Sequence, residues 1–393
     1  MIKLCDIQNC TGCGACLNAC KHKAISMKEN EDGFLFPEIN YDTCISCNLC
    51  TKVCPELNID NIERHNVKEC YASYAKSNLI RERSSSGGIF SVIANFILNQ
   101  SGIVVGAAMQ DDYKLNHLCI SNLNDLGLLQ GSKYLQSDTK YTFSEIKSAL
   151  KSNKTVLFCG SPCQVAGLKS FLNKSETKNL ITCDFICHGV PSYLPLKKLI
   201  KSSSKMQKIS ASQICFRNLR KWNIGIYLKK KLFCWEYLYP VKGTEDFYFK
   251  AYLNGYMNRE CCYQCPYTNT QRTGDITIAD FWNIEPKDEL KSNKLYKGVS
   301  FIGINTEKGL QIINIIKNQL FLQERSISEI KNNNAQFNHP AHRPKERDTF
   351  YLSIKNKTWD EITIEYNYKP KSLSLVDTIK IYKNIIFSLK KSK

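Results

Sequence analysis

Hydrophobic and polar positions follow two patterns along this chain, and the pattern changes close to residue 66. Before that point cysteines dominate the spacing, and Asp32-Gly33 is a pair typical of a tight β-hairpin turn. After it, short apolar runs of strand length alternate with segments that have one apolar face at helical spacing. We therefore predict a small N-terminal domain over residues 1–66, an α/β body over 67–340 and a C-terminal extension over 341–393.

The body is predicted to alternate between buried strands and amphipathic helices. SSSGGIFSVIANFILNQ has apolar residues at Phe90, Ile93, Phe96 and Ile97 behind a serine cap, which indicates a helix. FSEIKSALKSN indicates a second helix, and four apolar runs indicate strands: GIVVGAAM, KTVLFCG, LITCDFIC and DITIAD. This mixture is typical of an α/β or α+β catalytic domain, so the predicted fold class of the whole chain is α+β.

One stretch is uncharged for long enough to raise the question of a membrane span. Residues 84–110 contain no Asp, Glu, Lys or Arg. The run is interrupted at Asn99-Gln100-Ser101-Gly102, and the helix before this break has about 11 residues, too few to cross a bilayer. We predict a buried helix followed by a buried strand.

The last segment begins at the Pro- and His-containing stretch NHPAHRPKER. Its final part, SLSLVDTIKIYKNIIFSLKKSK, carries lysines on one face and an apolar stripe on the other, formed by Leu375, Ile379, Tyr382, Ile386 and Leu389. Two interpretations remain open for this basic helix. It either lies on a membrane surface as a peripheral contact, or it docks on the body or on a partner protein.

Two cysteine runs, CTGCGACLNAC from Cys10 and CISCNLCTKVC from Cys44, repeat at a distance of 34 residues. Two, two and three residues separate the cysteines of each run, which is typical of bacterial-type ferredoxins with two 4Fe–4S clusters. Zinc sites usually combine two separate C-x2-C pairs. Disulfide frameworks are typical of short secreted chains, and MIKLCDIQNC has neither the apolar segment nor the cleavage site of a signal peptide.

In such ferredoxins three cysteines of one run and the fourth cysteine of the other run hold each cluster. The first predicted ligand set is Cys10, Cys13, Cys16 and Cys54, and the second is Cys44, Cys47, Cys50 and Cys20. Small residues in the first run, Gly12, Gly14 and Ala15, allow backbone amides to approach the sulfurs. Pro55 follows the second run as the ferredoxin pattern expects, whereas Lys21 stands in place of proline after the first.

Charge is distributed unevenly along the chain. The formal net charge is +18, but residues 1–66 hold 6 Lys/Arg and 9 Asp/Glu, which leaves +21 for the remainder. A basic body can bind nucleic acid, but no recognition motif accompanies the charge, and Lys and Asn are abundant throughout. We expect no nucleic-acid partner, and a basic body also suits cofactors that carry phosphates. Twenty cysteines without an export signal favour a reducing, cytoplasmic compartment.

Four further cysteines are expected to meet in the body. Cys163 begins a predicted helix after a strand, Cys187 follows the next strand, and Cys262 and Cys265 form a C-x2-C pair. Because strand ends converge at one edge of an α/β sheet, we predict that these thiols hold a third 4Fe–4S cluster. Zinc is the alternative, and Cys261 could replace Cys262. The other cysteines are expected to be small buried residues: Cys5, Cys70, Cys119, Cys159, Cys183, Cys215 and Cys234.

Ser84-Ser85-Ser86-Gly87-Gly88 precedes the apolar helix. Backbone amides at a helix N-terminus bind anions such as the pyrophosphate of a dinucleotide; a capped helix with a glycine turn is the alternative. GSKYLQS, residues 131–137, offers a lysine, a tyrosine and hydroxyls for phosphate or ring contacts. No acid–base pair stands out, since His188 either donates a proton or caps a turn, and Asp275 and Asp280 only flank a strand.

Six motifs occur in order along the chain: RSSSGGIF, GSKYLQS, LFCGSPCQVAGL, DFICHGVPS, CCYQCPY and GDITIADFW. With them, residues 1 to about 350 resemble the coenzyme F420 hydrogenase/dehydrogenase beta subunit family, here with an N-terminal two-cluster ferredoxin domain. The resemblance implies a flavin- and iron–sulfur-binding body. It places FAD near Ser85, Ser86, Gly87, Gly88, Lys133 and Tyr134. It also supports ligation of the body cluster by Cys163, Cys187, Cys262 and Cys265.

The resemblance further implies an FAD-dependent iron–sulfur oxidoreductase. Members of the family pass electrons between 4Fe–4S clusters, FAD and a reducible partner, which is the deazaflavin coenzyme F420 in archaeal members and a chlorophyll derivative in a plant reductase. Two alternatives remain: a ferredoxin-dependent flavin reductase of another metabolite, without F420, and a non-catalytic electron-transfer protein. The expected partner is a redox protein or a small-molecule substrate.

Overall fold

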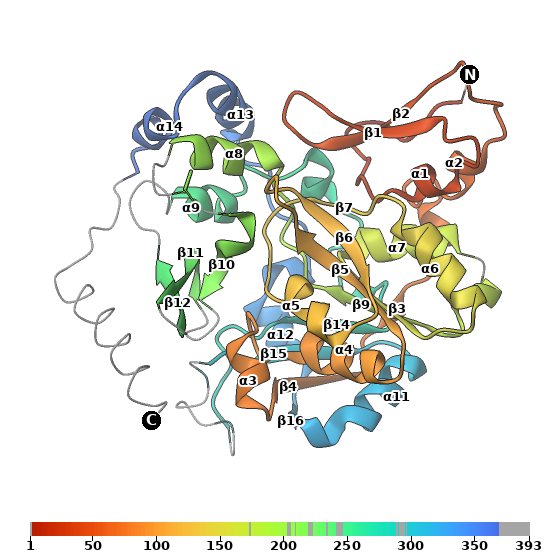
Figure 1. The fold of residues 1–393 in the computed structure, drawn as a ribbon, viewed down its shortest axis with the longest axis vertical. Coiled ribbons are helices and arrows are strands. Elements are labelled where there is room, and N and C mark those ends of the chain that lie inside the picture. The colour runs from red at the N-terminus through yellow and green to blue at the C-terminus, as the bar shows by residue number, and fades with distance from the viewer. Residues whose placement is uncertain are drawn as a thin grey trace.

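The computed structural model describes residues 2–172, 174–202, 206–208, 210–218, 223–232, 235–240, 247–287, 290, 295 and 297–368. The N-terminal domain lies against one side of a body that is built around a large sheet (Figure 1). The amphipathic segment predicted from Leu375 to Leu389 lies outside the described residues, and so does Cys234.

The N-terminal domain is made of the two cysteine runs and a hairpin between them. β1 (Ile25–Glu29) pairs antiparallel with β2 (Leu35–Ile39), and Gly33 in their turn has a φ of +78°. The predicted hairpin is therefore confirmed. The third cysteine of each run lies in a short helix, α1 (Ala15–Ala19) or α2 (Leu49–Lys52), and the 3-10 helix η1 (Ile59–Asn61) follows.

The two cysteine runs share a backbone conformation as well as a sequence. Gly12 and Gly14 have φ angles of +67° and +81°, and the equivalent residues of the second run, Ser46 and Asn48, have +56° and +59°. Positive φ is uncommon outside glycine. Alternating left-handed and ordinary residues turn successive N–H groups toward one point and form an anion-binding nest. Each run is thus shaped to surround a negatively charged group.

The body contains a nine-stranded sheet with the order β16-β4-β15-β14-β9-β8-β5-β6-β7. The central strands β14, β9, β8 and β5 run parallel, and they are the four strands predicted from the apolar runs. Antiparallel strands flank them, except that the edge strand β7 is parallel to β6. The bounds are β4 (Glu69–Ala75), β5 (Ile103–Met109), β6 (Leu115–Ile120), β7 (Ser137–Asp138), β8 (Val156–Gly160), β9 (Leu180–Phe185), β14 (Ile276–Asp280), β15 (Ser300–Ile304) and β16 (Leu320–Glu324).

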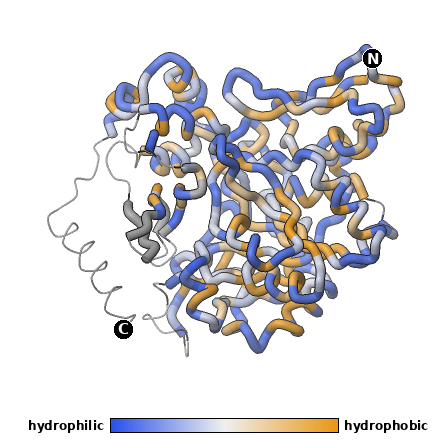
Figure 2. Tube along the Cα trace, viewed as in Figure 1, coloured by the Kyte–Doolittle hydropathy of each residue, from blue (hydrophilic) through white to orange (hydrophobic). Residues whose placement is uncertain are grey.

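Helices cover both faces of this sheet because strand residues alternate in direction (Figure 1). Leu157 of β8 packs with residues of α4 and α11, whereas Val156 and Phe158 pack with residues of α6 and α7. Figure 2 shows the hydrophobic segments gathered along these elements and hydrophilic residues at the tip of the β1–β2 hairpin. The helices around the sheet are α3 (Asn78–Glu82), α4 (Ile89–Asn99), α5 (Leu126–Leu129), α6 (Thr142–Lys151), α7 (Pro162–Phe171), α11 (Glu307–Ile316) and α12 (Ile327–Asn333).

A second layer of helices includes the C-terminal pair α13 (Arg347–Asn356) and α14 (Trp359–Glu365). Phe350 and Trp359 are fully buried in one cluster with Leu196 of α8 (Tyr193–Ser202) and Phe247 of α9 (Phe247–Leu253). These residues of the C-terminal extension therefore pack against helices of the body. A three-stranded sheet lies beside it: β10 (Ile214–Asn218), β11 (Asn223–Leu232) and β12 (Trp235–Pro240).

A short strand pair joins the two cysteine-bearing parts of the chain. β3 (His65–Asn66), at the end of the N-terminal domain, pairs antiparallel with β13 (Gln271–Arg272) of the body. Among the helices of the described ranges, none is both long and apolar enough to cross a membrane.

Asp184 at the end of β9 is fully buried, and its carboxylate accepts hydrogen bonds from Gly274 N–H (2.9 Å), Thr277 Oγ1 (2.6 Å) and Arg272 Nη2 (3.1 Å). We expect Asp184→Asn to destabilise the fold by about 3 kcal/mol, because it leaves a buried guanidinium without its counter-charge. Thermal unfolding of the anaerobically purified protein measures this loss. Asp111→Asn, at an exposed carboxylate, is the control, and equal midpoints for both variants would contradict the expectation.

Candidate functional site

A cavity of about 410 Å³ lies at the carboxyl ends of the parallel strands. Cys159 and Gly160 of β8, Phe185 of β9 and Asp280 of β14 line it. Ligands of open α/β sheets bind at this edge, because the loops that follow each strand converge there. The sheet therefore places the candidate site where the sequence expected the body cysteines to meet.

Each body cysteine enters the cavity from a different element. Cys163 lies in the first turn of α7, which starts with Pro162 and is capped by the Ser161–Gln164 capping box. Cys187 follows the end of β9, and Cys265 ends the 3-10 helix η6 (Glu260–Gln264). The Oγ of Ser161 lies 3.1 Å from the Sγ of Cys163.

The structure brings Cys163, Cys187 and Cys265 together. Burial raises the pKa of Cys187 to about 12, and the neighbouring thiol of Cys265 contributes next. Burial also raises the pKa of Cys163, and the thiols of Cys265 and Cys187 add to the rise. Cys261 and Cys262 both line the cavity, so both stay candidates for the fourth ligand: Cys262, as predicted, and Cys261 as the alternative.

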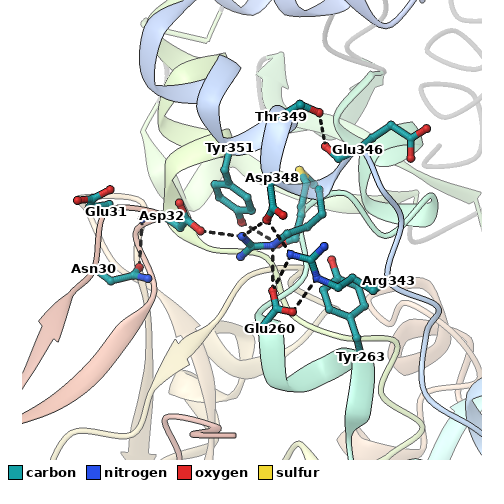
Figure 3. A network of polar contacts seen from close by, with 12 residues as sticks. Asn30, Glu31, Asp32, Glu260, Tyr263, Arg343, Glu346, Asp348, Thr349 and Tyr351 are labelled. Carbon is teal, nitrogen blue, oxygen red and sulfur yellow. Dashed lines mark hydrogen bonds and ion pairs between the residues drawn. The ribbon is translucent and has the colours of Figure 1, made fainter. Parts of the chain in front are cut away.

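A network of ion pairs holds η6 in place (Figure 3). Glu260, immediately before Cys261, accepts from Arg343 Nε at 2.7 Å, and Arg343 Nη2 also lies 2.7 Å from Asp348. Arg347 of α13 reaches Asp32 of the β1–β2 hairpin at 2.9 Å. The hairpin, the C-terminal helix and the cysteine-bearing η6 therefore meet at one point.

The predicted first ferredoxin set takes its cysteines from both runs. Cys10, Cys13, Cys16 and Cys54 line one small cavity beneath the hairpin. Burial raises the pKa of Cys13 to about 12, although the backbone N–H of Ala15 lowers it. Cys5, which we expected to be a buried bystander, is half-buried and lines the same cavity.

The second ferredoxin set lies nearer the surface. Burial raises the pKa of Cys50, and the neighbouring thiols of Cys47 and Cys20 add to the rise. Cys44 packs in the same small cluster as Cys50 and Cys20, and the N–H of Ala24 donates to the Sγ of Cys20 at 3.2 Å. Cys47 is exposed to solvent.

The donor sets fit iron–sulfur clusters on chemical grounds. Buried thiolates are unfavourable without a positive partner, and a metal replaces the proton of each thiol that binds it. Within the described ranges, no three His, Cys, Asp or Glu side chains are close enough to hold a single metal ion. A 4Fe–4S cluster is larger than one ion and takes its thiolates at separate irons. Left-handed residues in both runs aim N–H groups at such an anionic group.

The serine–glycine loop forms another wall of the 410 Å³ cavity. Ser85, Ser86 and Gly88 line it, and Gly88, with φ +89°, caps the N-terminus of α4. Gly87 lies behind them, where a Cβ atom would come within 2.4 Å of the carbonyl of Ser73. The Oγ of Ser85 accepts from the N–H of Ser132 at 2.7 Å, so the loop and GSKYLQS share one wall.

Lys133 and Tyr134 line the same cavity, but their polar atoms already have partners. The Nζ of Lys133 donates to three backbone carbonyls, those of Leu129, Gln130 and Gly131, at 3.1–3.2 Å. Burial lowers the pKa of Lys133 to about 8. The Tyr134 hydroxyl accepts from Arg217 Nη1 at 3.1 Å. Lys133 therefore contributes charge to the wall rather than a free donor.

The acidic and histidine candidates have separate roles. Asp275 accepts hydrogen bonds from Thr182 and Thr306, which makes it structural. Asp280 lines the cavity and forms an ion pair with Arg217 at 2.6 Å. His188 also lines the cavity, and burial lowers its pKa.

Sequence reasoning missed three buried groups at this site: Arg217, Arg259 and His117. Single arginines and histidines have no motif around them, because their partners are far away in the chain. Only Arg259 had a local signal, since it stands two residues before the cysteine pair Cys261-Cys262.

The two adjacent cysteines of η6 can be told apart by iron content. We expect Cys262→Ser to lose about four irons per chain, the content of one cluster, because Cys262 is the predicted fourth ligand and lines the cavity with Cys163, Cys187 and Cys265. Cys261→Ser, the matched variant, is expected to keep them. Iron and acid-labile sulfide assays on anaerobic protein give the answer, and loss of iron from Cys261→Ser alone would assign the ligand to Cys261 instead.

His117 introduces a pH dependence of stability. Its Nε2 lies 3.2 Å from the carbonyl of Cys159 and its Nδ1 2.9 Å from the Oγ of Ser137, so the ring is held neutral with the proton on Nε2. Burial lowers its pKa from 6.5 to about 4. As the pH falls, the unfolded chain binds this proton near pH 6.5, whereas the folded chain binds it only near pH 4. The free energy of unfolding is therefore highest above pH 6.5 and decreases as the pH falls toward 4. His117→Gln should show a smaller drop in unfolding midpoint over that window than the unsubstituted protein; an identical drop would exclude this role.

Two family models match separate parts of the chain. The 4Fe-4S dicluster domain model matches residues 9–58, and the model for the C terminus of the coenzyme F420 hydrogenase/dehydrogenase beta subunit matches residues 153–330. No curated protein matches the chain. A chain of the F420-reducing NiFe hydrogenase complex from Methanosarcina barkeri aligns with a TM-score of 0.46 and 16% identity, over 77% of this chain and 92% of that one.

The two matched ranges hold all the predicted cluster ligands, including the eight ferredoxin cysteines and the body cysteines from Cys163 to Cys265. The family resemblance drawn from the six motifs is confirmed. The chain is thus an iron–sulfur oxidoreductase with an N-terminal 4Fe–4S dicluster domain, and residues 153–330 relate it to the coenzyme F420 hydrogenase/dehydrogenase beta subunit.

Proposed function

We propose that the chain is an FAD-dependent oxidoreductase that passes electrons between two ferredoxin-type clusters, a third 4Fe–4S cluster in the body, FAD and a reducible substrate such as coenzyme F420. One observation carries the proposal. The 410 Å³ cavity is lined at once by the serine–glycine loop, by the body cysteines and by Thr11 and Gly12 of the first ferredoxin run.

The three thiol sets follow one another from the surface to the cavity. Cys47 of the second set is exposed, whereas Cys13 of the first set is buried. The first set adjoins the body set, since Thr11 and Gly12 of the first run line the cavity together with Cys163, Cys187 and Cys265. Burial raises the pKa of the intervening Glu56 to about 7, and Glu56 acts in turn on Cys13 and Cys265. This order supports electron transfer from the surface to the cavity, or in reverse.

Different residues of the cavity suit different parts of a flavin. Backbone N–H groups at the start of α4, beside Ser85 and Ser86, suit the pyrophosphate. The apolar walls, which include Phe90, Leu129 and Ile278, suit a ring system and exclude water. When bound, a flavin would exchange electron pairs with the substrate and single electrons with the clusters.

Cofactor content tests the proposal directly. Protein purified without oxygen should contain about twelve irons, the content of three clusters, together with an equal amount of acid-labile sulfide and one acid-released FAD per chain. Substrate screening with F420 and with other reducible metabolites then separates deazaflavin chemistry from a flavin reductase of another metabolite. Full iron content without flavin would contradict the proposal and favour a non-catalytic electron-transfer protein.

Ser85→Asp is expected to reduce FAD content at least tenfold while iron content stays unchanged. A carboxylate at this wall repels the pyrophosphate, and the 1.4 kcal/mol that a tenfold loss requires is modest for two like charges in a partly buried site. Ser77→Asp is the matched control, because Ser77 caps the separate helix α3 and aspartate caps equally well. Equal flavin loss from both variants, or from neither, would place the pyrophosphate elsewhere.

A further inference from the structure

Arg259 lies where the ferredoxin domain meets the body, and its side chain is only 1% exposed. Its Nε donates to the carbonyl of Cys10 at 2.7 Å, and its Nη1 donates to the carbonyl of Leu35 at 2.9 Å. Its own backbone N–H donates to the carbonyl of Val190 at 2.9 Å. One side chain from the body is thus bonded to the first cysteine run and to strand β2.

The surroundings of Arg259 strengthen its electric field. The guanidinium stacks on Phe36, with 3.9 Å to the ring centroid, and this cover keeps water away. Charges act over longer distances where water is excluded. The guanidinium bonds to the carbonyl of Cys10 at 2.7 Å. The same residue lines the 410 Å³ cavity together with Cys163, Cys187 and Cys265.

One donor of Arg259 remains unused. Nη2 is buried and has no hydrogen-bond partner, and the residue lines the 410 Å³ cavity beside Cys261. An unsatisfied buried N–H group of a charged side chain costs stability. Hydrogen bonds to the sulfurs are among the features that set the reduction potential of an iron–sulfur cluster. Nη2 is therefore available to a thiolate or sulfide at either thiol set.

We infer that Arg259 is a positioning residue shared by the first ferredoxin cluster and the body cluster, and that it raises the reduction potential of both. Reduction adds a negative charge to a cluster, and a fixed guanidinium beside it stabilises that charge. The second ferredoxin cluster, at Cys44, Cys47, Cys50 and Cys20, does not have Arg259 beside it. Its reduction potential is therefore lower, and electrons reside preferentially on the two clusters at the interface between the domains. The inference rests on the proposed function, because it requires clusters at both thiol sets.

Redox titration of the full-length holoprotein, followed by electron paramagnetic resonance, tests the inference. Arg259→Gln removes the charge but keeps a planar donor, and it should lower the midpoint potentials of the first ferredoxin cluster and the body cluster while the second ferredoxin cluster is unchanged. Arg259→Lys keeps the charge and should leave all three potentials close to those of the unsubstituted protein. Arg325→Gln is the matched control, because Arg325 is a buried arginine that pairs with Glu329, away from the cysteine sets.

Iron content separates the possible failures. Full iron content with unchanged potentials in Arg259→Gln overturns the inference and leaves the proposed function standing. An equal fall at all three clusters also overturns it, since a general loosening of the fold would act on every cluster. If Arg259→Gln loses iron, the test rests on Arg259→Lys, which keeps the positive charge. Lowered cluster potentials in Arg259→Lys would then overturn the electrostatic role of Arg259. Fewer than about twelve irons in the unsubstituted protein would instead overturn the proposed function.

Discussion

The burial of cysteine thiols at one edge of a parallel sheet is the constraint on which the rest of this structure depends. Thiolates away from water need positive charge close by. No single segment of the chain supplies four thiols at this edge of the sheet. The body set therefore draws on α7, on the end of β9 and on η6. Strand β9 is fixed by the sheet and α7 by its capping box, so the fold positions the residues that carry these thiols.

The ferredoxin domain is held against that edge by contacts of unequal strength. Exposed ion pairs, such as Lys355 with Glu31, contribute little because water screens them. Arg347 is 8% exposed and reaches Asp32, and Arg259 is 1% exposed and bonds to Cys10 and Leu35. The β3–β13 pair adds a backbone connection between the N-terminal domain and the body. The buried contacts therefore fix the spacing between the thiol sets.

The cavity shows how the fold combines motifs that are distant in sequence. Ser85 and Ser132 come from two motifs and share a hydrogen bond across one wall. The family resemblance assigned Lys133 to the flavin, and the residue does line the cavity. Its ammonium group, however, donates to three backbone carbonyls at the end of α5 and just after it. A polar residue in a motif can thus shape a binding site by holding the backbone of its wall in place and by adding charge to it.

The sequence by itself determined the ferredoxin repeat, the hairpin between its halves and the four central strands, because spacing, turn pairs and apolar runs act within a few residues. It also identified the body cysteines as a group. Only the tertiary structure decided that Phe350 and Trp359 belong to the core, and that Arg259 bonds to the first cysteine run while it lines the cavity of the body cysteines. These features depend on contacts between segments far apart in the chain, and local spacing carries no record of such contacts.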